Sequence, residues 1–171
     1  MQIITDHIRD IPDFPSAGIM FKDLTPLLGN HQALAETTRL LAAPFRDADI
    51  SAVVGMEARG FIFGSLVAQA LGVGFVPLRK PGKLPAETYS VSYDLEYGSA
   101  ELHMHQDALR AGQSVLLVDD LIATGGTAAA SIKLVERAGA TIAGCAFVVE
   151  LDFLAGRVAL GDVSVHSLVH Y

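Results

Sequence analysis

The sequence lacks most features of secreted, membrane-spanning or zinc-stapled proteins. Its one cysteine, Cys145, excludes an internal disulfide and a cysteine-based zinc site. A lone cysteine in an apolar stretch is expected to be a small buried side chain, and such cysteine usage is typical of the reducing cytoplasm. No apolar run approaches the ~20 residues of a membrane-spanning helix. The first residues are acidic and interrupted by proline, which is not the pattern of a signal peptide.

Positive charge is also scarce. The chain has 12 Lys and Arg residues against 19 Asp and Glu residues, a formal net charge of −7. This balance argues against nucleic acid as a partner. An anionic small molecule would have to be bound by local donors rather than by a positive field over the whole surface. The only dense basic cluster is 79–83, directly after an apolar stretch.

The 171 residues predict one domain, 1–171, of the α/β class. Apolar runs suited to buried strands alternate with helical patterns, which indicates a mostly parallel five-stranded sheet flanked by helices. The expected strands are 52–54, 74–78, 115–118, 142–149 and 163–169. The expected helices begin after Asn30, at 61 and at 128. Residues 1–30 are rich in proline and glycine and are expected to be irregular, whereas 84–106 alternate loosely and predict an exposed hairpin.

The stretch from Ser114 to Ala128 carries the clearest functional pattern, SVLLVDDLIATGGTA. An apolar strand leads into a turn rich in glycine and threonine, and the turn leads into a helix. Ligands of open α/β sheets bind beyond the carboxyl ends of the strands, and a helix N-terminus offers free N–H groups to phosphate. The predicted phosphate-binding residues of the turn are Ala123, Thr124, Gly125, Gly126 and Thr127.

Two acids, Asp119 and Asp120, stand between the apolar run and this turn. Carboxylates repel phosphate but accept hydrogen bonds from vicinal hydroxyls, so the acids are expected to bind a ribose. Acids in this position can also cap a helix or bind a metal ion. Their combination with the TGGT turn favours a ribose 5-phosphate.

This stretch resembles the phosphoribosyl-pyrophosphate signature of the type I phosphoribosyltransferases, and the resemblance extends along nearly the whole chain. It is closest to the members of that family that act on adenine. It implies that adenine and 5-phosphoribosyl 1-pyrophosphate are converted to AMP and pyrophosphate in purine salvage. It also implies Mg²⁺ held mainly by the substrate rather than by direct protein ligands, a homodimer in the cytoplasm, an N-terminal hood over the purine at 1–30 and a flexible hairpin lid at 80–100.

The resemblance also assigns the remaining site residues. The segment FPSAGIMFKD resembles the family's hood, and the family often has Arg where this chain has Lys22. The implied adenine contacts are Met20, Phe21, Lys22 and Leu151. The implied pyrophosphate contacts are Arg59, Arg79, Lys80 and Lys83, some of which reach a neighbouring subunit in the family. The implied catalytic residues are Glu96, Tyr97 and Arg59. The family's pyrophosphate loop further predicts a strained or cis peptide between Glu57 and Ala58.

The identity of the base depends on an absence. Relatives that act on oxopurines place a lysine late in the chain to bind the 6-oxo group, and here no lysine follows Lys133. The sequence therefore favours a 6-amino purine. Two alternatives stay open: a phosphoribosyltransferase for xanthine or hypoxanthine, and a non-catalytic regulator that binds phosphoribosyl pyrophosphate. The regulator would need a DNA-binding element, and the chain has no basic helical extension. His103 and His105 could hold a metal ion, but an ordinary hairpin face is favoured.

Overall fold

A computed structural model describes residues 1–94 and 99–171. The fold is α/β, with a central parallel sheet of five strands in the order β4-β3-β7-β8-β9. The strands of this sheet are β3 (Ala52–Met56), β4 (Gly74–Leu78), β7 (Ser114–Ile122), β8 (Thr141–Glu150) and β9 (Val165–His170). The predicted sheet is confirmed. Within the described part of the chain, no helix is long and apolar enough to cross a bilayer.

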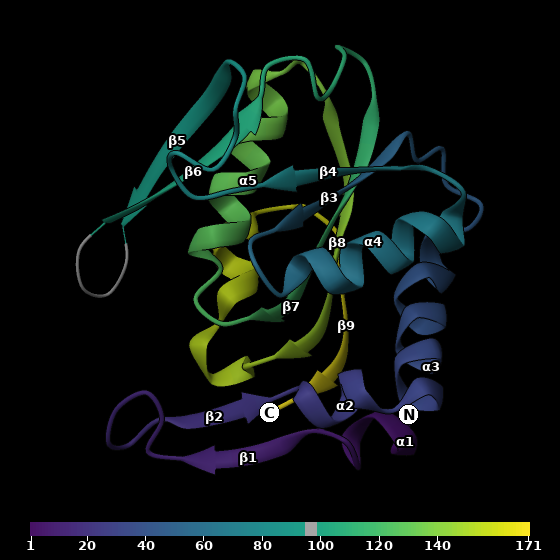
Figure 1. The fold of residues 1–171 in the computed structure, drawn as a ribbon, viewed down its shortest axis with the longest axis vertical. Coiled ribbons are helices and arrows are strands. Elements are labelled where there is room, and N and C mark those ends of the chain that lie inside the picture. The colour runs from purple at the N-terminus through teal and green to yellow at the C-terminus, as the bar shows by residue number, and fades with distance from the viewer. Residues whose placement is uncertain (95–98) are drawn as a thin grey trace.

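Helices cover both faces of the sheet (Figure 1). Helices α3 (His31–Ala42) and α4 (Gly60–Leu71) pack on one face, and α5 (Gly126–Arg137) packs on the other. Strand β7 shows why the sheet can bury both faces. Its consecutive residues Leu116 and Leu117 are both fully buried, but on opposite faces. Leu116 lies in the apolar cluster under α3 and α4, and Leu117 lies in the apolar cluster under α5.

The helix ends follow local chemistry that the sequence signalled. Asn30 caps α3 because its Oδ1 accepts a hydrogen bond of 3.0 Å from the N–H of Ala33. Gly72 ends α4 in the left-handed conformation, with φ of 71°. The start of α3 after Asn30 was predicted.

The N-terminal segment is more regular than the sequence suggested. It forms α1 (Gln2–Thr5), an antiparallel pair of β1 (Arg9–Pro12) and β2 (Met20–Asp23), and α2 (Thr25–Gly29). The expectation of an irregular segment was wrong: Pro12, Pro15 and Gly18 lie at the end of β1 and in the turn that follows it, and Pro26 fits in the first turn of α2. We call residues 1–30 the hood, and it lies across one end of the sheet (Figure 1).

The hairpin predicted within 84–106 consists of β5 (Thr88–Asp94) and β6 (Ser99–His105). It is less exposed than predicted. Leu102 and Met104 of β6 are only 3% and 0% exposed, and Tyr89, Val91 and Tyr93 of β5 pack against the core cluster that contains α5. The stem of the hairpin therefore belongs to the domain core, whereas the loose alternation of its sequence predicted an exposed hairpin.

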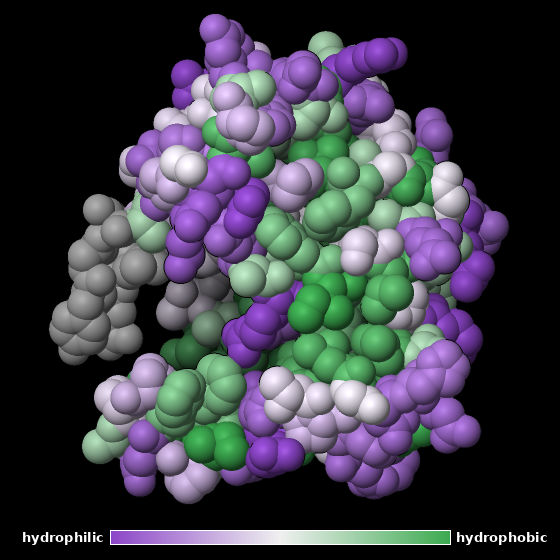
Figure 2. All heavy atoms as spheres, in the orientation of Figure 1, coloured by the Kyte–Doolittle hydropathy of each residue, from purple (hydrophilic) through white to green (hydrophobic). Residues whose placement is uncertain are grey.

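The molecule also exposes an apolar surface over α3 and α4, seen in Figure 2. A shallow cavity there is lined mainly by aliphatic side chains such as Leu34, Leu66 and Ala70, and Ile62 nearby is 39% exposed. This surface lies on the opposite face of the sheet from α5.

Candidate active site

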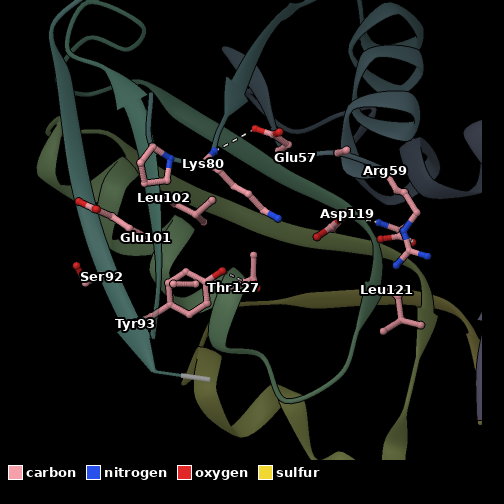
Figure 3. A pocket seen from close by; sticks show the side chains of 14 residues that line it. Glu57, Arg59, Lys80, Ser92, Tyr93, Glu101, Leu102, Asp119, Leu121 and Thr127 are labelled. Atoms are coloured by element: carbon pink, nitrogen blue, oxygen red, sulfur yellow. Dashed lines mark hydrogen bonds and ion pairs between the residues drawn. The ribbon is translucent and has the colours of Figure 1, made fainter. Parts of the chain in front are cut away.

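A cavity of about 710 Å³ opens beyond the carboxyl ends of β3, β4 and β7 (Figure 3). Because parallel strands end at the same edge of a sheet, segments far apart in sequence meet there. The lining comprises Glu57, Ala58, Arg59, Lys80, Pro81, Ser92, Tyr93, Ala100, Glu101, Leu102, Asp119, Asp120, Leu121 and Thr127. The cavity thus combines residues that follow β3 and β4 with both acids of β7 and with the hairpin.

The two acids lie within β7, which continues through Ile122 instead of ending at Val118 as predicted. The carboxylate of Asp119 accepts a hydrogen bond of 2.8 Å from the N–H of Asp120. Helix α4 approaches closely, since a Cβ on Gly60 would lie 2.6 Å from Asp119 Oδ1. Burial and the charge of Asp120 raise the pKa of Asp119 well above its usual range. Ionisation of Asp119 in the folded protein therefore costs free energy.

Arg59 offsets part of this charge. Its Nε lies 2.8 Å from Asp120 Oδ2, and Asp120 is only 4% exposed. Its guanidinium also lies 5.3 Å from the centre of the Phe21 ring in the hood. The family resemblance assigned Arg59 to the pyrophosphate contacts and to the catalytic residues. The structure places it between the predicted ribose acids and the predicted purine-binding residue Phe21.

The predicted phosphate turn forms a second, smaller hollow of about 110 Å³. Ala123, Thr124, Gly125, Gly126 and Thr127 all line it, together with Asp119 and Leu121, which it shares with the larger cavity. Gly125 has φ of 81° and begins α5 without a side-chain cap, so the first N–H groups of α5 remain open to a ligand. The turn has the geometry expected of an anion site.

Glu57 organises the basic turn, a role that the sequence did not reveal. Its Oε2 accepts hydrogen bonds from Arg79 Nε at 3.1 Å and from the N–H of Lys80 at 3.0 Å. Burial disfavours the charged form of Glu57, but the Lys80 N–H and the Arg79 guanidinium together hold its pKa below the usual range. The Glu57–Ala58 peptide is cis, as predicted.

Of the predicted pyrophosphate residues, Arg59 and Lys80 line the large cavity, whereas Arg79 and Lys83 are absent from its described lining. Arg79 is engaged by Glu57 and donates to the carbonyl of Lys83 at 3.3 Å. Lys83 is exposed. The structure therefore brings half of this set to the cavity of its own chain.

The predicted adenine residues come from the hood and from the end of β8, and none of them belongs to the described lining of either cavity. Phe21 contacts Phe14 edge to face, with ring centroids 5.0 Å apart, while Met20 is 49% exposed. Leu151 directly follows β8, and its N–H donates to the carbonyl of Ile122 at 3.0 Å, which ties it to the end of β7. The ammonium of Lys22 lies 2.7 Å from Asp10 Oδ1 and 3.5 Å from the centre of the Tyr171 ring. The Lys22 side chain is thus committed to the hood.

Glu96 and Tyr97 lie outside the described residues. In the described part of the hairpin, Tyr93 reaches the phosphate turn, where its hydroxyl lies 3.3 Å from Thr127 Oγ1 (Figure 3). Sequence reasoning missed Tyr93, although its alternation with Tyr89 and Val91 could have shown that these three side chains share one face.

The rings of His103 and His105 each have a protein partner in the hairpin region. His103 Nδ1 lies 3.1 Å from Thr88 Oγ1, and His105 Nε2 accepts a hydrogen bond from the N–H of Ala86.

One group of acids with a histidine lies elsewhere. Among the described residues, Glu150, Asp152 and His170 could together face a metal ion. Arg157 already holds both oxygens of Glu150, at 2.6 and 2.7 Å, and its hydrogen bonds hold the pKa of Glu150 below the usual range. This group therefore fits an ion-pair network that fixes the end of β8.

Comparisons with known proteins agree with this geometry. A model of the phosphoribosyl transferase domain matches residues 24–163. The adenine phosphoribosyltransferase of Nitrosococcus oceani is 63% identical over 171 residues, which is 100% of both chains. The solved structure of the enzyme of that name from Thermoanaerobacter pseudethanolicus is 49% identical, with a TM-score of 0.97 over 99% of each chain.

A third relative was solved with ligands. The adenine phosphoribosyltransferase of Saccharomyces cerevisiae, complexed with D-2,5-dideoxy-2,5-imino-altritol 1,6-bisphosphate and adenine, is 45% identical. Its TM-score is 0.91, and the match covers 98% of this chain and 97% of that one.

Proposed function

The chain belongs to the phosphoribosyl transferase family, and from that membership and its site we infer that it is the transferase that joins adenine to 5-phosphoribosyl 1-pyrophosphate. The products are AMP and pyrophosphate, and the reaction belongs to purine salvage. The observation that carries this conclusion is the pair of acids in β7 followed at once by an open phosphate turn, with both facing adjoining cavities. This arrangement fits a ribose 5-phosphate.

We propose one subsite for each part of the substrates. Asp119 and Asp120 accept hydrogen bonds from the ribose hydroxyls, and the turn at 123–127 binds the 5′-phosphate. Lys80, which lines the same cavity, binds the pyrophosphate. Phe21 and Leu151 lie on either side of the purine. Lys22 contributes backbone groups, because its side chain is engaged by Asp10 and Tyr171.

The chemistry replaces one bond to the anomeric carbon by another. The bond to the pyrophosphate oxygen breaks with its electron pair, the purine N9 forms the new bond, and the N9 proton is released. Positive charge builds on the ribose ring as pyrophosphate leaves, and the carboxylates of Asp119 and Asp120 stabilise it. Arg59 lies beside Asp120 and beside Phe21, so it can adjust this charge where ribose and purine meet.

Mg²⁺ is the proposed cofactor, and the substrate itself would supply most of its ligands. The donor set fits this assignment. Four acids line the cavity. Glu57 and Asp120 are paired with Arg79 and Arg59, and Glu101 lies 3.3 Å from His103, so among the described residues a cation would depend on substrate oxygens for most of its ligands. When bound, Mg²⁺ neutralises the departing pyrophosphate.

The roles predicted for Glu96 and Tyr97, which lie outside the described residues, and the closing of residues 80–100 as a lid stay predictions. If a lid closes, hydrogen exchange across 80–100 should slow when phosphoribosyl pyrophosphate and Mg²⁺ are added, and equal exchange with and without these ligands would reject the lid.

We further propose a homodimer in the cytoplasm. Lys83 is exposed and, among described residues, does not line its own cavity, which suits a contact with a neighbouring subunit. Sedimentation at the mass of one 18.1 kDa chain would reject the dimer.

The test of the function is a panel of bases. Phosphoribosyl pyrophosphate and Mg²⁺ are supplied with adenine, guanine, hypoxanthine or xanthine, and pyrophosphate release is measured. We expect release with adenine, and we expect a chelator of Mg²⁺ to suppress it. The proposal would be contradicted if pyrophosphate were released as fast with an oxopurine as with adenine, or if no base led to its release.

A further inference from the structure

The hairpin and the phosphate turn meet at a pair of hydroxyl groups. Tyr93, on β5, directs its hydroxyl to within 3.3 Å of Thr127 Oγ1, and either atom can be the donor. Figure 3 shows the two side chains facing each other at the base of the large cavity, which both of them line. Thr127 lies in the first turn of α5 and also lines the smaller hollow of the phosphate turn.

Tyr93 is held in this place by the rest of its strand. The guanidinium of Arg137, at the far end of α5, lies 5.4 Å from the centre of the Tyr89 ring and donates to the carbonyl of Ser90 at 3.1 Å. Tyr89, Val91 and Tyr93 alternate along β5 and pack on the same core cluster. The strand is thus fixed to one end of α5 by Arg137 and to the other by the contact between Tyr93 and Thr127.

The hydroxyl of Thr127 has one proton and two acceptor positions. A phosphate dianion in the turn can only accept hydrogen bonds, so the Thr127 hydroxyl must donate its hydrogen bond to the phosphate. Tyr93 can then keep its hydrogen bond with Thr127 only if the Tyr93 hydroxyl is the donor and Thr127 Oγ1 the acceptor. The chain from Tyr93 to Thr127 to phosphate has one direction, and each bond in such a chain strengthens the other.

We propose that Tyr93 is a positioning residue for the 5′-phosphate: it orients the Thr127 hydroxyl toward the ligand, and phosphate binding in turn tightens the attachment of β5 to α5. This inference rests on the proposed function, because it takes the turn at 123–127 as the phosphate site. It adds a residue from the hairpin to a site built otherwise from β7 and α5.

The test removes single hydroxyl groups. Tyr93→Phe should weaken binding of ribose 5-phosphate about 2- to 10-fold in calorimetry, the range for one hydrogen bond. The KM for phosphoribosyl pyrophosphate should rise by a similar factor while the KM for adenine stays unchanged. The matched control is Tyr89→Phe, which removes a hydroxyl from the same face of β5 for which the described residues provide no hydrogen-bond partner. Tyr89→Phe should bind ribose 5-phosphate like the wild type.

A double-mutant cycle separates positioning from a general effect on packing. In Thr127→Val, which keeps the shape of the side chain, the further change Tyr93→Phe should cost nothing more. Equal binding by Tyr93→Phe and the wild type, or an equal loss in both backgrounds, would overturn the proposal. Ribose 5-phosphate binding does not depend on the base. If the cycle shows this coupling but the wild type forms no AMP from adenine, the proposed function is rejected and this inference stands.

Discussion

Gly125→Ala should lower kcat/KM for phosphoribosyl pyrophosphate at least about 100-fold, mainly through KM. Gly125 has φ of 81°, and a Cβ there would overlap the carbonyl oxygen of Gly156 and lie 3.0 Å from the Cβ of Ala159. Neither neighbour is a flexible side chain, so the turn itself must move. A hydrogen bond to a charged group contributes about 1.5–3 kcal/mol, and losing two of them corresponds to about 100-fold or more.

The chain offers a matched control at Gly112. This residue has φ of 83°, nearly the same as Gly125, but a Cβ there would meet no heavy atom within 4 Å. Gly112→Ala should therefore pay only the left-handed backbone cost of about 1–2 kcal/mol in stability and leave the kinetics unchanged. Thermal unfolding and steady-state kinetics of both variants give the comparison. If folded Gly125→Ala retains the kinetics of Gly112→Ala, the turn does not bind the phosphate.

Asp119→Asn should lower kcat/KM about 10- to 100-fold and yet stabilise the folded protein. The kinetic loss follows from one charge-assisted bond to ribose, about 1.5–3 kcal/mol. The gain in stability follows from the raised pKa of Asp119, which burial and Asp120 cause. A carboxyl whose pKa is raised by folding destabilises the protein as pH rises from about 4 through that raised pKa. The gain in Tm over the wild type should therefore grow with pH over this window.

Asp120→Asn makes the informative contrast. It should cost activity by a similar factor, but it removes the anion that lies 2.8 Å from the Arg59 guanidinium, so it should not stabilise the protein. Unchanged kinetics in both folded variants would remove the acids from the mechanism. A gain in Tm for Asp119→Asn that does not vary with pH would show that charge is not its cause.

The central strands β3, β7 and β8 could be predicted because each contains a run of apolar residues that is buried on both faces. Strand β7 was predicted too short, because Asp119 and Asp120 interrupt its apolar run although its pairing with β8 continues to Ile122. The hood strands β1 and β2 were missed for a related reason. Their stability comes from pairing with each other, and their flanking prolines and glycine signal only the turn.

The site was predicted as a set of residue types but not as a network. The acids and the turn are contiguous, so their spacing alone indicated a ribose 5-phosphate. The contacts of Arg59 with Asp120, of Glu57 with Arg79 and of Tyr93 with Thr127 join different segments, with no local signal in the sequence. Arg59 illustrates the limit: its position after β3 indicated an anion ligand, and the structure supplies an anion from the protein itself.

The central claim is the choice of adenine, and competition between bases tests it most directly. Equimolar adenine and hypoxanthine are incubated with phosphoribosyl pyrophosphate, Mg²⁺ and the wild-type protein, and AMP and IMP are quantified together at early times. A site built to hydrogen-bond one base can reject a mispaired analogue by several orders of magnitude, so AMP should exceed IMP at least about 1,000-fold. Comparable amounts of the two nucleotides, or an excess of IMP, would contradict the account.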